Sequence, residues 1–95
     1  MMTFAELIDD AERRDEHWAD LAKVDFAIDL KSLMTSRNIC EKELAERIGC
    51  TVERVRSTLR GDDDLDVLWM VRLSRAFGCS LLIGIEDPDL EFKKI

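Results

Sequence analysis

Basic side chains gather in one third of this acidic chain, and they are the residues whose types and spacing best fit a chemical role. The 95 residues hold 14 lysines and arginines against 21 aspartates and glutamates, which gives a net charge of −7. Residues 31–61 hold seven basic and four acidic side chains. Residues 1–30 hold three basic and nine acidic side chains, and residues 62–95 hold four basic and eight acidic ones. Guanidinium and ammonium groups bind phosphates and base edges. The positive third is therefore the expected place of a nucleic-acid contact surface, and the plainer alternative is a solvated helix face.

Covalent and metal chemistry find little support in the sequence. His17 is the only histidine, so the chain offers no plausible nucleophile–base pair, and it has no glycine-rich phosphate loop. Cys40, Cys50 and Cys79 are odd in number, widely spaced and without a Cys-x-x-Cys pair, which indicates neither a zinc site nor a disulfide framework. We therefore expect no enzyme, no cofactor and no bound metal.

The length and the apolar pattern set the class of protein. Ninety-five residues suffice for one small core and a single domain. No apolar run approaches the roughly 18 residues of a membrane span, and the first ten residues are acidic where a signal peptide is basic and then apolar. The sequence therefore predicts a cytoplasmic protein with no membrane partner.

Two short helices are needed to position the basic residues. Apolar side chains recur at helical spacing on both sides of Gly49: Leu44, Ala45 and Ile48 before it, Val55 and Leu59 after it. A glycine can adopt the left-handed conformation that ends the first helix sharply, and the small Ala45 lets the two helices cross closely. The hydroxyl of Thr51 can cap the second helix.

Three further helices are expected around this pair. Thr3 with Glu6 forms a capping box for a helix over about residues 4–14, and an apolar stripe predicts a second helix over about residues 18–36. Asp66 can cap a helix that ends near Phe77 and is closed by Gly78. The predicted fold class is therefore mainly α.

Residues 80–86 are rich in branched apolar side chains after a glycine turn and predict a single β-strand. A lone strand has unpaired backbone groups on both edges, so the same strand of a second copy is its simplest partner. Leu81, Leu82, Ile83 and Ile85 would then form a dimer interface. The alternative is an extended segment packed on its own helices.

Over roughly residues 26–85 the sequence resembles the lambda-repressor-like (Cro/C1-type, XRE family) helix-turn-helix regulators. The resemblance rests on residues in the order and spacing of that family: Glu43, Leu44, Ala45, Gly49, Thr51, Val55, Leu59, Arg60, Gly61, Leu65, Leu73, Ala76, Phe77 and Gly78. It implies a helix-turn-helix DNA-binding domain over 26–79, an N-terminal helical extension over 1–25, a dimerisation strand over 80–86 and a polar tail over 87–95.

In this family the start of the second helix of the motif lies in the major groove of DNA. Carried over by position, the residues implied for base contacts are Val52, Glu53, Arg56 and Ser57. The residues implied for phosphate contacts are Lys42, Thr51, Arg54 and Arg60.

The resemblance implies a sequence-specific transcriptional regulator, expected to be a dimeric repressor that binds an inverted repeat in double-stranded DNA, commonly in its own operon. Phage, anti-CRISPR-associated and antitoxin contexts all occur in the family. A small domain can repress simply by blocking access to a promoter. The alternative is a helix-turn-helix fold that binds a toxin or another protein and has little or no affinity for DNA.

Several residues depart from the family pattern. Glu41 stands where a phosphate donor is usual, so its carboxylate is expected to repel a phosphate, and Asp62, Asp63 and Asp64 form an acidic loop near the expected backbone contact. Thr58 occupies a position that is usually apolar. Trp69 either extends the core with Leu73 and Ala76 or forms an exposed patch with Leu68 that marks a protein-binding site.

Overall fold

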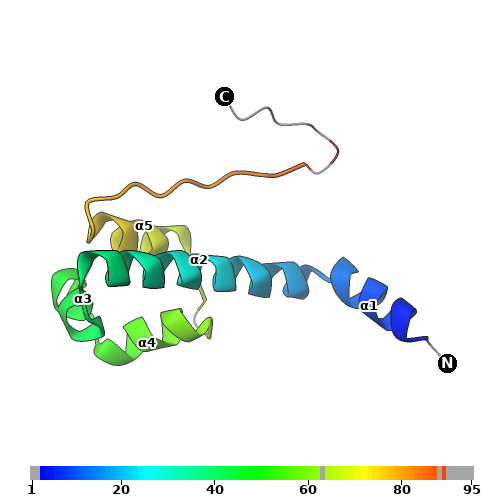
Figure 1. The fold of residues 1–95 in the computed structure, drawn as a ribbon, viewed down its shortest axis with the longest axis horizontal. Helices are drawn as coiled ribbons and strands as arrows, with labels where there is room; N and C mark the ends of the chain where they lie inside the picture. The colour runs from blue at the N-terminus through cyan, green and yellow to red at the C-terminus, as the bar shows by residue number, and fades with distance from the viewer. Residues whose placement is uncertain (1–2, 63, 88, 90–95) are drawn as a thin grey trace.

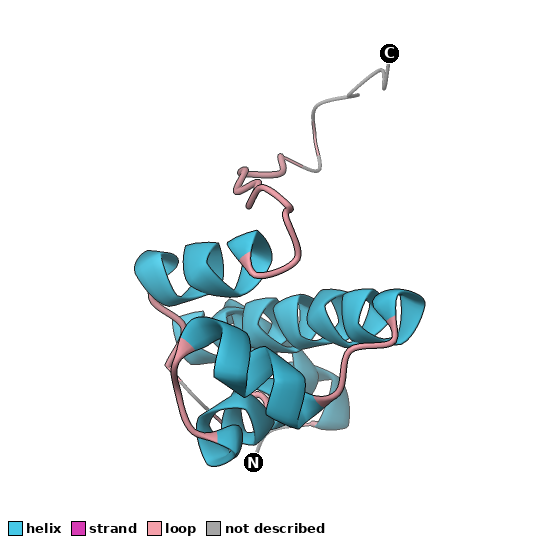
Figure 2. Ribbon diagram, turned by 90° about the vertical axis from the view of Figure 1, so that its left-hand side faces the viewer, coloured by secondary structure: helices cyan, strands magenta, loops and turns pink. Residues whose placement is uncertain are grey.

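The computed structural model describes residues 3–62, 64–87 and 89, and its regular elements are all helices (Figures 1 and 2). The mainly α class predicted from the sequence is confirmed. Part of the acidic loop, Asp63, and most of the expected tail lie outside the described residues. The five helices are α1 (Phe4–Arg13), α2 (Asp15–Arg37), α3 (Glu41–Ile48), α4 (Val52–Arg60) and α5 (Val67–Arg75).

The long helix α2 runs through the whole length of the helical body, with α3 and α4 on one side and α5 on the other (Figure 1). Ala27, Leu30 and Met34 bury one face of its second half. Asn38 ends the helix in the left-handed conformation, with φ 53°. The helix continues without a break past residues 25 and 26, where the expected N-terminal extension was to meet the expected helix-turn-helix domain.

Helix α1 begins where the sequence predicts. The hydroxyl of Thr3 accepts a hydrogen bond from the backbone N–H of Glu6 at 3.2 Å. This bond satisfies one of the donors that every helix leaves unpaired at its start. In Figure 1, α1 extends beyond the first turn of α2, away from α3, α4 and α5.

A short turn joins α3 to α4, and Gly49 makes it possible. Gly49 has φ 79°, and its N–H donates to the carbonyl of Ala45 at 2.9 Å. Thr51 then accepts a hydrogen bond from the N–H of Arg54 at 3.2 Å, which caps α4. Ala45 and Val55 are both buried at the place where the two helices pack. The glycine stop, the small residue and the threonine cap therefore lie as the sequence predicts.

One apolar cluster holds α2–α5 together. Its buried members are Leu30, Met34, Ile39, Leu44, Ala45, Val55, Leu59, Trp69, Leu73 and Phe77. Trp69 is only 2% exposed, whereas its neighbour Leu68 is 68% exposed. Of the two interpretations of this pair, Trp69 extends the core, and only Leu68 remains an exposed apolar side chain.

Thr58 is buried because Trp69 provides a partner for its hydroxyl. The indole Nε1–H of Trp69 donates to Oγ1 of Thr58 at 3.0 Å, and that hydroxyl in turn donates to the carbonyl of Arg54 at 3.0 Å. A buried polar group costs little when its hydrogen bonds are complete. The polar residue at a usually apolar position is therefore explained by the tryptophan that it contacts.

Residues 80–86 have no regular secondary structure in this single chain, so the expected strand is not formed here. The segment runs back along α5 and α2 in an extended course (Figure 1). A hollow of about 610 Å³ lies between it and the two helices, lined by Phe26, Leu33 and Met70 among others. A strand needs a second strand to satisfy its backbone groups, and none of the described residues offers one.

None of the helices in the described residues combines the length and the apolar character needed to cross a membrane.

Candidate nucleic-acid interface

The first turns of α4 place the residues implied for base contacts in two different environments. Glu53 and Arg56 are exposed, while Ser57 is half-buried. Val52 is also half-buried and packs against the core cluster. The outer surface of α4 therefore offers mainly Glu53 and Arg56 to a ligand, with Ser57 at its edge.

Arg56 is held by a carboxylate from the preceding helix. Its Nε lies 2.6 Å from Oε2 of Glu41, and the two side chains are 55% and 38% exposed. The pair joins the start of α3 to the middle of α4, so it supports the packing of the two helices. A nucleic acid that binds Arg56 has to displace Glu41 or bind the donors of the guanidinium that Glu41 leaves free.

Arg60 lies between two acids at the other end of α4. It donates to Asp62 at 2.9 Å and to Glu53 at 3.1 Å. The hydrogen bond to Asp62 first, and the bond to Glu53 second, raise the pKa of Arg60 above its ordinary value. Arg60 is cationic, as arginines in proteins are, and Asp62 and Glu53 neutralise part of its charge.

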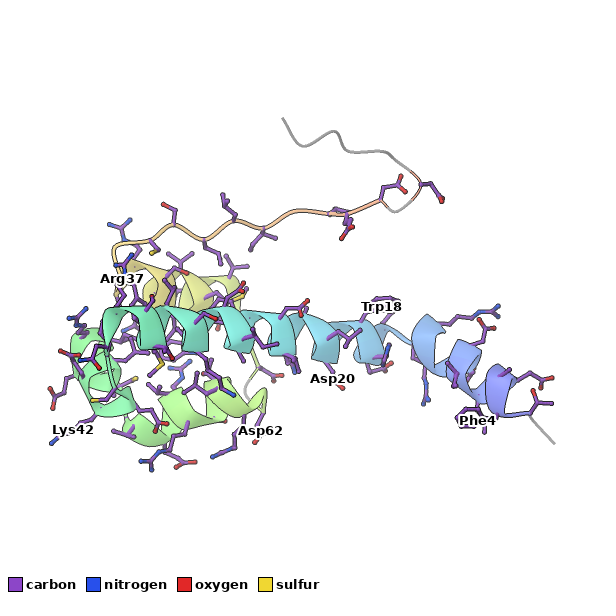
Figure 3. All side chains as sticks on the ribbon, in the orientation of Figure 1. Phe4, Trp18, Asp20, Arg37, Lys42 and Asp62 are labelled. Carbon is purple, nitrogen blue, oxygen red and sulfur yellow. The ribbon has the colours of Figure 1, made fainter. Side chains whose placement is uncertain are left out.

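Arg54 and Thr51, both assigned to phosphate contacts, also serve the fold. The guanidinium of Arg54 lies 3.8 Å from the centroid of the Trp69 ring, a cation–π contact. The hydroxyl of Thr51 caps α4. Lys42 is exposed near the start of α3, and none of the ion pairs among the described residues includes it (Figure 3).

Three other arginines donate hydrogen bonds to backbone carbonyls at or just after helix ends. Arg37 donates to the carbonyl of Phe77, Arg47 to that of Ala76 at 3.1 Å, and Arg72 to that of Ile48 at 3.0 Å. Carbonyls at a helix C-terminus lack partners within the helix, and a cation there is also favoured by the helix dipole. Arg37 and Arg47 belong to residues 31–61, so two of the seven basic side chains of that third already bind the backbone of this chain.

Glu41 and Asp62 are the residues whose roles the sequence did not reveal. Both were expected to disturb a phosphate contact, and the structure shows that each also binds an arginine of α4. For Arg60 and Glu53 a signal was present, because seven residues span about two helical turns and place both on one face. Arg56 and Glu41 lie 15 residues apart on different helices, where local spacing says nothing.

The residues expected at a dimer interface are largely open to solvent in this chain. Leu82 and Ile85 are 92% and 96% exposed, Ile83 is also exposed, and Leu81 is half-buried. The three cysteines carry free thiols, and Cys40 is exposed. Within the described part of the chain, no group of three or more metal-ligating side chains comes together.

Comparison with known proteins finds no match to a protein-family model, a curated protein or a solved structure.

Proposed function

We propose that the protein is a sequence-specific DNA-binding transcriptional regulator that acts as a dimeric repressor, with its own operon as the first expected target. The observation that carries this proposal is the geometry of α3 and α4. Two short helices meet at a left-handed glycine, the second is capped by Thr51, and its early turns expose Glu53 and Arg56. A helix-turn-helix places the second helix in the major groove in this way.

The proposed contacts divide by chemistry. Arg56 can donate two hydrogen bonds to guanine, and Glu53 can accept from cytosine. Ser57 lies at the edge of the surface and can bond several bases. Lys42, Arg54 and Arg60 provide positive charge beside α4 and are assigned to phosphates, which fix the orientation of the protein without reading sequence.

Dimerisation supplies the second half of the proposed site. Exposed branched residues at 82, 83 and 85 and the extended course of the segment support pairing with the same segment of a second copy. A two-fold axis would then place two copies of α4 about 34 Å apart, one turn of the DNA helix. The target would be an inverted repeat, and repression would follow from occlusion of a promoter.

The experiment that tests this proposal is a selection from genomic DNA. Purified protein is incubated with fragmented DNA of its source at low and at physiological salt, and the retained fragments are sequenced. We expect an inverted repeat to be enriched, with an affinity that falls steeply as salt rises because bound phosphates release counterions. No enrichment at either salt would reject the proposal.

A second candidate is a helix-turn-helix fold that binds protein, as in an antitoxin or inhibitor. The pairing of Arg56 with Glu41 and of Arg60 with Glu53 and Asp62 supports it. These arginines would have to contact DNA, and they are already bound to carboxylates of the protein. The net charge of −7 acts in the same direction. This candidate predicts no affinity for duplex DNA even at low salt, which the same experiment measures.

A further inference from the structure

The N-terminal arm, residues 4–29, carries large apolar side chains that the core does not use. Phe4 is 78% exposed, Leu21 41% and Ile28 53%. No described side chain between residues 4 and 25 is buried. Figure 3 shows Phe4 and Trp18 on the part of the molecule that extends away from α3, α4 and α5. Exposed apolar area of this kind marks a place where another surface binds.

The exposed residues of α2 form a stripe with acidic edges. Leu21, Val24 and Ile28 are all exposed and recur at i, i+3 and i+7, which places them on one face of the helix. At 100° per residue, Asp20 and Asp25 lie on the two sides of this stripe. The spacing is that of a helix that packs lengthwise against another helix.

The charge of the N-terminal arm decides what kind of helix can bind there. Residues 4–29 hold nine acidic and three basic side chains, a balance of −6. Two of the three bases are already paired, Arg13 with Asp9 at 2.8 Å and Lys23 with Asp64 at 3.3 Å. Asp20, Asp25 and Asp29 have no ion-pair partner among the residues that the structure describes.

We propose that the N-terminal arm is a docking surface for a basic amphipathic helix of a different protein. The stripe of α2 would bury the apolar face of that helix, and the flanking aspartates would pair with its lysines or arginines. A second copy of the arm is a poor occupant, because it would bring a second net charge of −6 close to the first. At separations below about 8–10 Å, salt does not screen the repulsion between them. The proposal is independent of DNA binding by α4.

The test uses the full chain, labelled with ¹⁵N, and a synthetic helical peptide built from leucine–lysine heptads. We expect chemical-shift changes concentrated in residues 4–29, together with weaker binding in high salt. A lysine–serine peptide of equal charge controls for charge alone, and an uncharged leucine–glutamine peptide controls for the apolar face alone. Both control peptides are expected not to bind.

The matched variants are Leu21→Ser with Ile28→Ser as the test and Leu68→Ser as the control. All three residues are exposed, so circular dichroism should show that both variants fold. We expect the double variant to lose affinity for the leucine–lysine peptide by at least ~10-fold, while Leu68→Ser keeps it. Duplex DNA affinity should be the same in both variants, so failure of this proposal and failure of the proposed function give different results.

Three outcomes would overturn the proposal. Equal binding of the lysine–serine peptide would show that the surface binds through its charge alone and that the apolar stripe does not contribute. Shift changes centred on α3 and α4 would place the peptide elsewhere. A dimer of the free protein that dissociates in the Leu21→Ser, Ile28→Ser variant would show that a second copy occupies the stripe.

Discussion

At the scale of single residues, the exposed surface of α4 is a set of arginines with acids beside them. Glu41 holds Arg56, and Asp62 with Glu53 holds Arg60. Ion pairs at exposed positions are weak because water and salt screen them, so a phosphate or a base can replace them at small cost. The carboxylate of Glu41 remains nearby after the exchange and repels the phosphate backbone. Binding strength should therefore depend on these acids as much as on the arginines.

Glu41→Gln is expected to tighten duplex DNA binding by about 3–10-fold, because it removes both the competitor for Arg56 and one negative charge at the surface. Fluorescence anisotropy with the selected duplex measures the change. Glu46→Gln is the matched control, since Glu46 is exposed on the same helix and forms no ion pair among the described residues. Weaker binding by Glu41→Gln would mean that the carboxylate positions Arg56 for its contact.

Arg56→Ala is expected to weaken specific binding by ~1–3 kcal/mol and to relax the preference at one base position. The physical reason is the loss of paired hydrogen bonds to a base edge. Binding to a panel of duplexes, each with one substituted base pair, measures both effects. Arg75→Ala removes the same charge from an exposed position on α5 and should change all sequences alike. If Arg56→Ala kept the same preference for each base pair, Arg56 would not contact a base.

At the scale of the elements, the turn between α3 and α4 depends on backbone conformation alone. Apart from the atoms of Gly49 and its two chain neighbours, a Cβ added to Gly49 would meet no atom within 4 Å, so alanine is disfavoured here only because of the φ of 79°. Side chains disfavour that region because Cβ approaches the following carbonyl oxygen.

Gly49→Ala is accordingly expected to lower the free energy of unfolding by about 1–2 kcal/mol. Urea unfolding followed by circular dichroism measures it. Gly84→Ala is the control, because Gly84 is also open to an added Cβ but lacks a positive φ. Equal midpoints for the two variants would show that the turn tolerates alanine.

The hydrogen bond between Thr58 and Trp69 ties α4 to α5 inside the core. Thr58→Val keeps the shape of the side chain but leaves the buried indole N–H without its partner, so we expect a loss of about 1–3 kcal/mol of stability. Thr35→Val, at an exposed position of α2, should cost much less. A Thr58→Val variant as stable as the native protein would show that the indole finds another acceptor.

The sequence predicted the helices well because apolar periodicity, caps and glycine stops are local signals. Gly49, Thr51 and Asp66 each ended or began a helix where expected. Contacts between elements were not predictable in this way. Nothing in the spacing of Thr58 and Trp69, or of Glu41 and Arg56, says that their helices bring them together. The segment 80–86 has the composition of a strand, but a strand also needs a partner, and composition does not provide one.

At the scale of the whole molecule, two exposed apolar regions flank the helical body: the N-terminal arm and the segment after α5. They differ in the surroundings of their apolar residues. Leu21, Val24 and Ile28 lie between acids on a formed helix, whereas residues 81–85 form a run without charge and without regular secondary structure. An uncharged extended segment can pair with its own copy, and an acidic helix is better matched by a basic partner.

Ile83→Glu is expected to dissociate the proposed dimer, because the two-fold axis would bring the introduced carboxylates of both copies close together in an apolar ribbon. Light scattering should show a fall from twice the chain mass to the single-chain mass of 11.0 kDa. Leu68→Glu places the same charge at an exposed apolar site of α5 and should leave the mass unchanged. The dissociated protein should also lose its preference for an inverted repeat over a single half-site, since only a dimer reads both halves. A dimer of unchanged mass in Ile83→Glu would exclude the ribbon and require another two-fold interface.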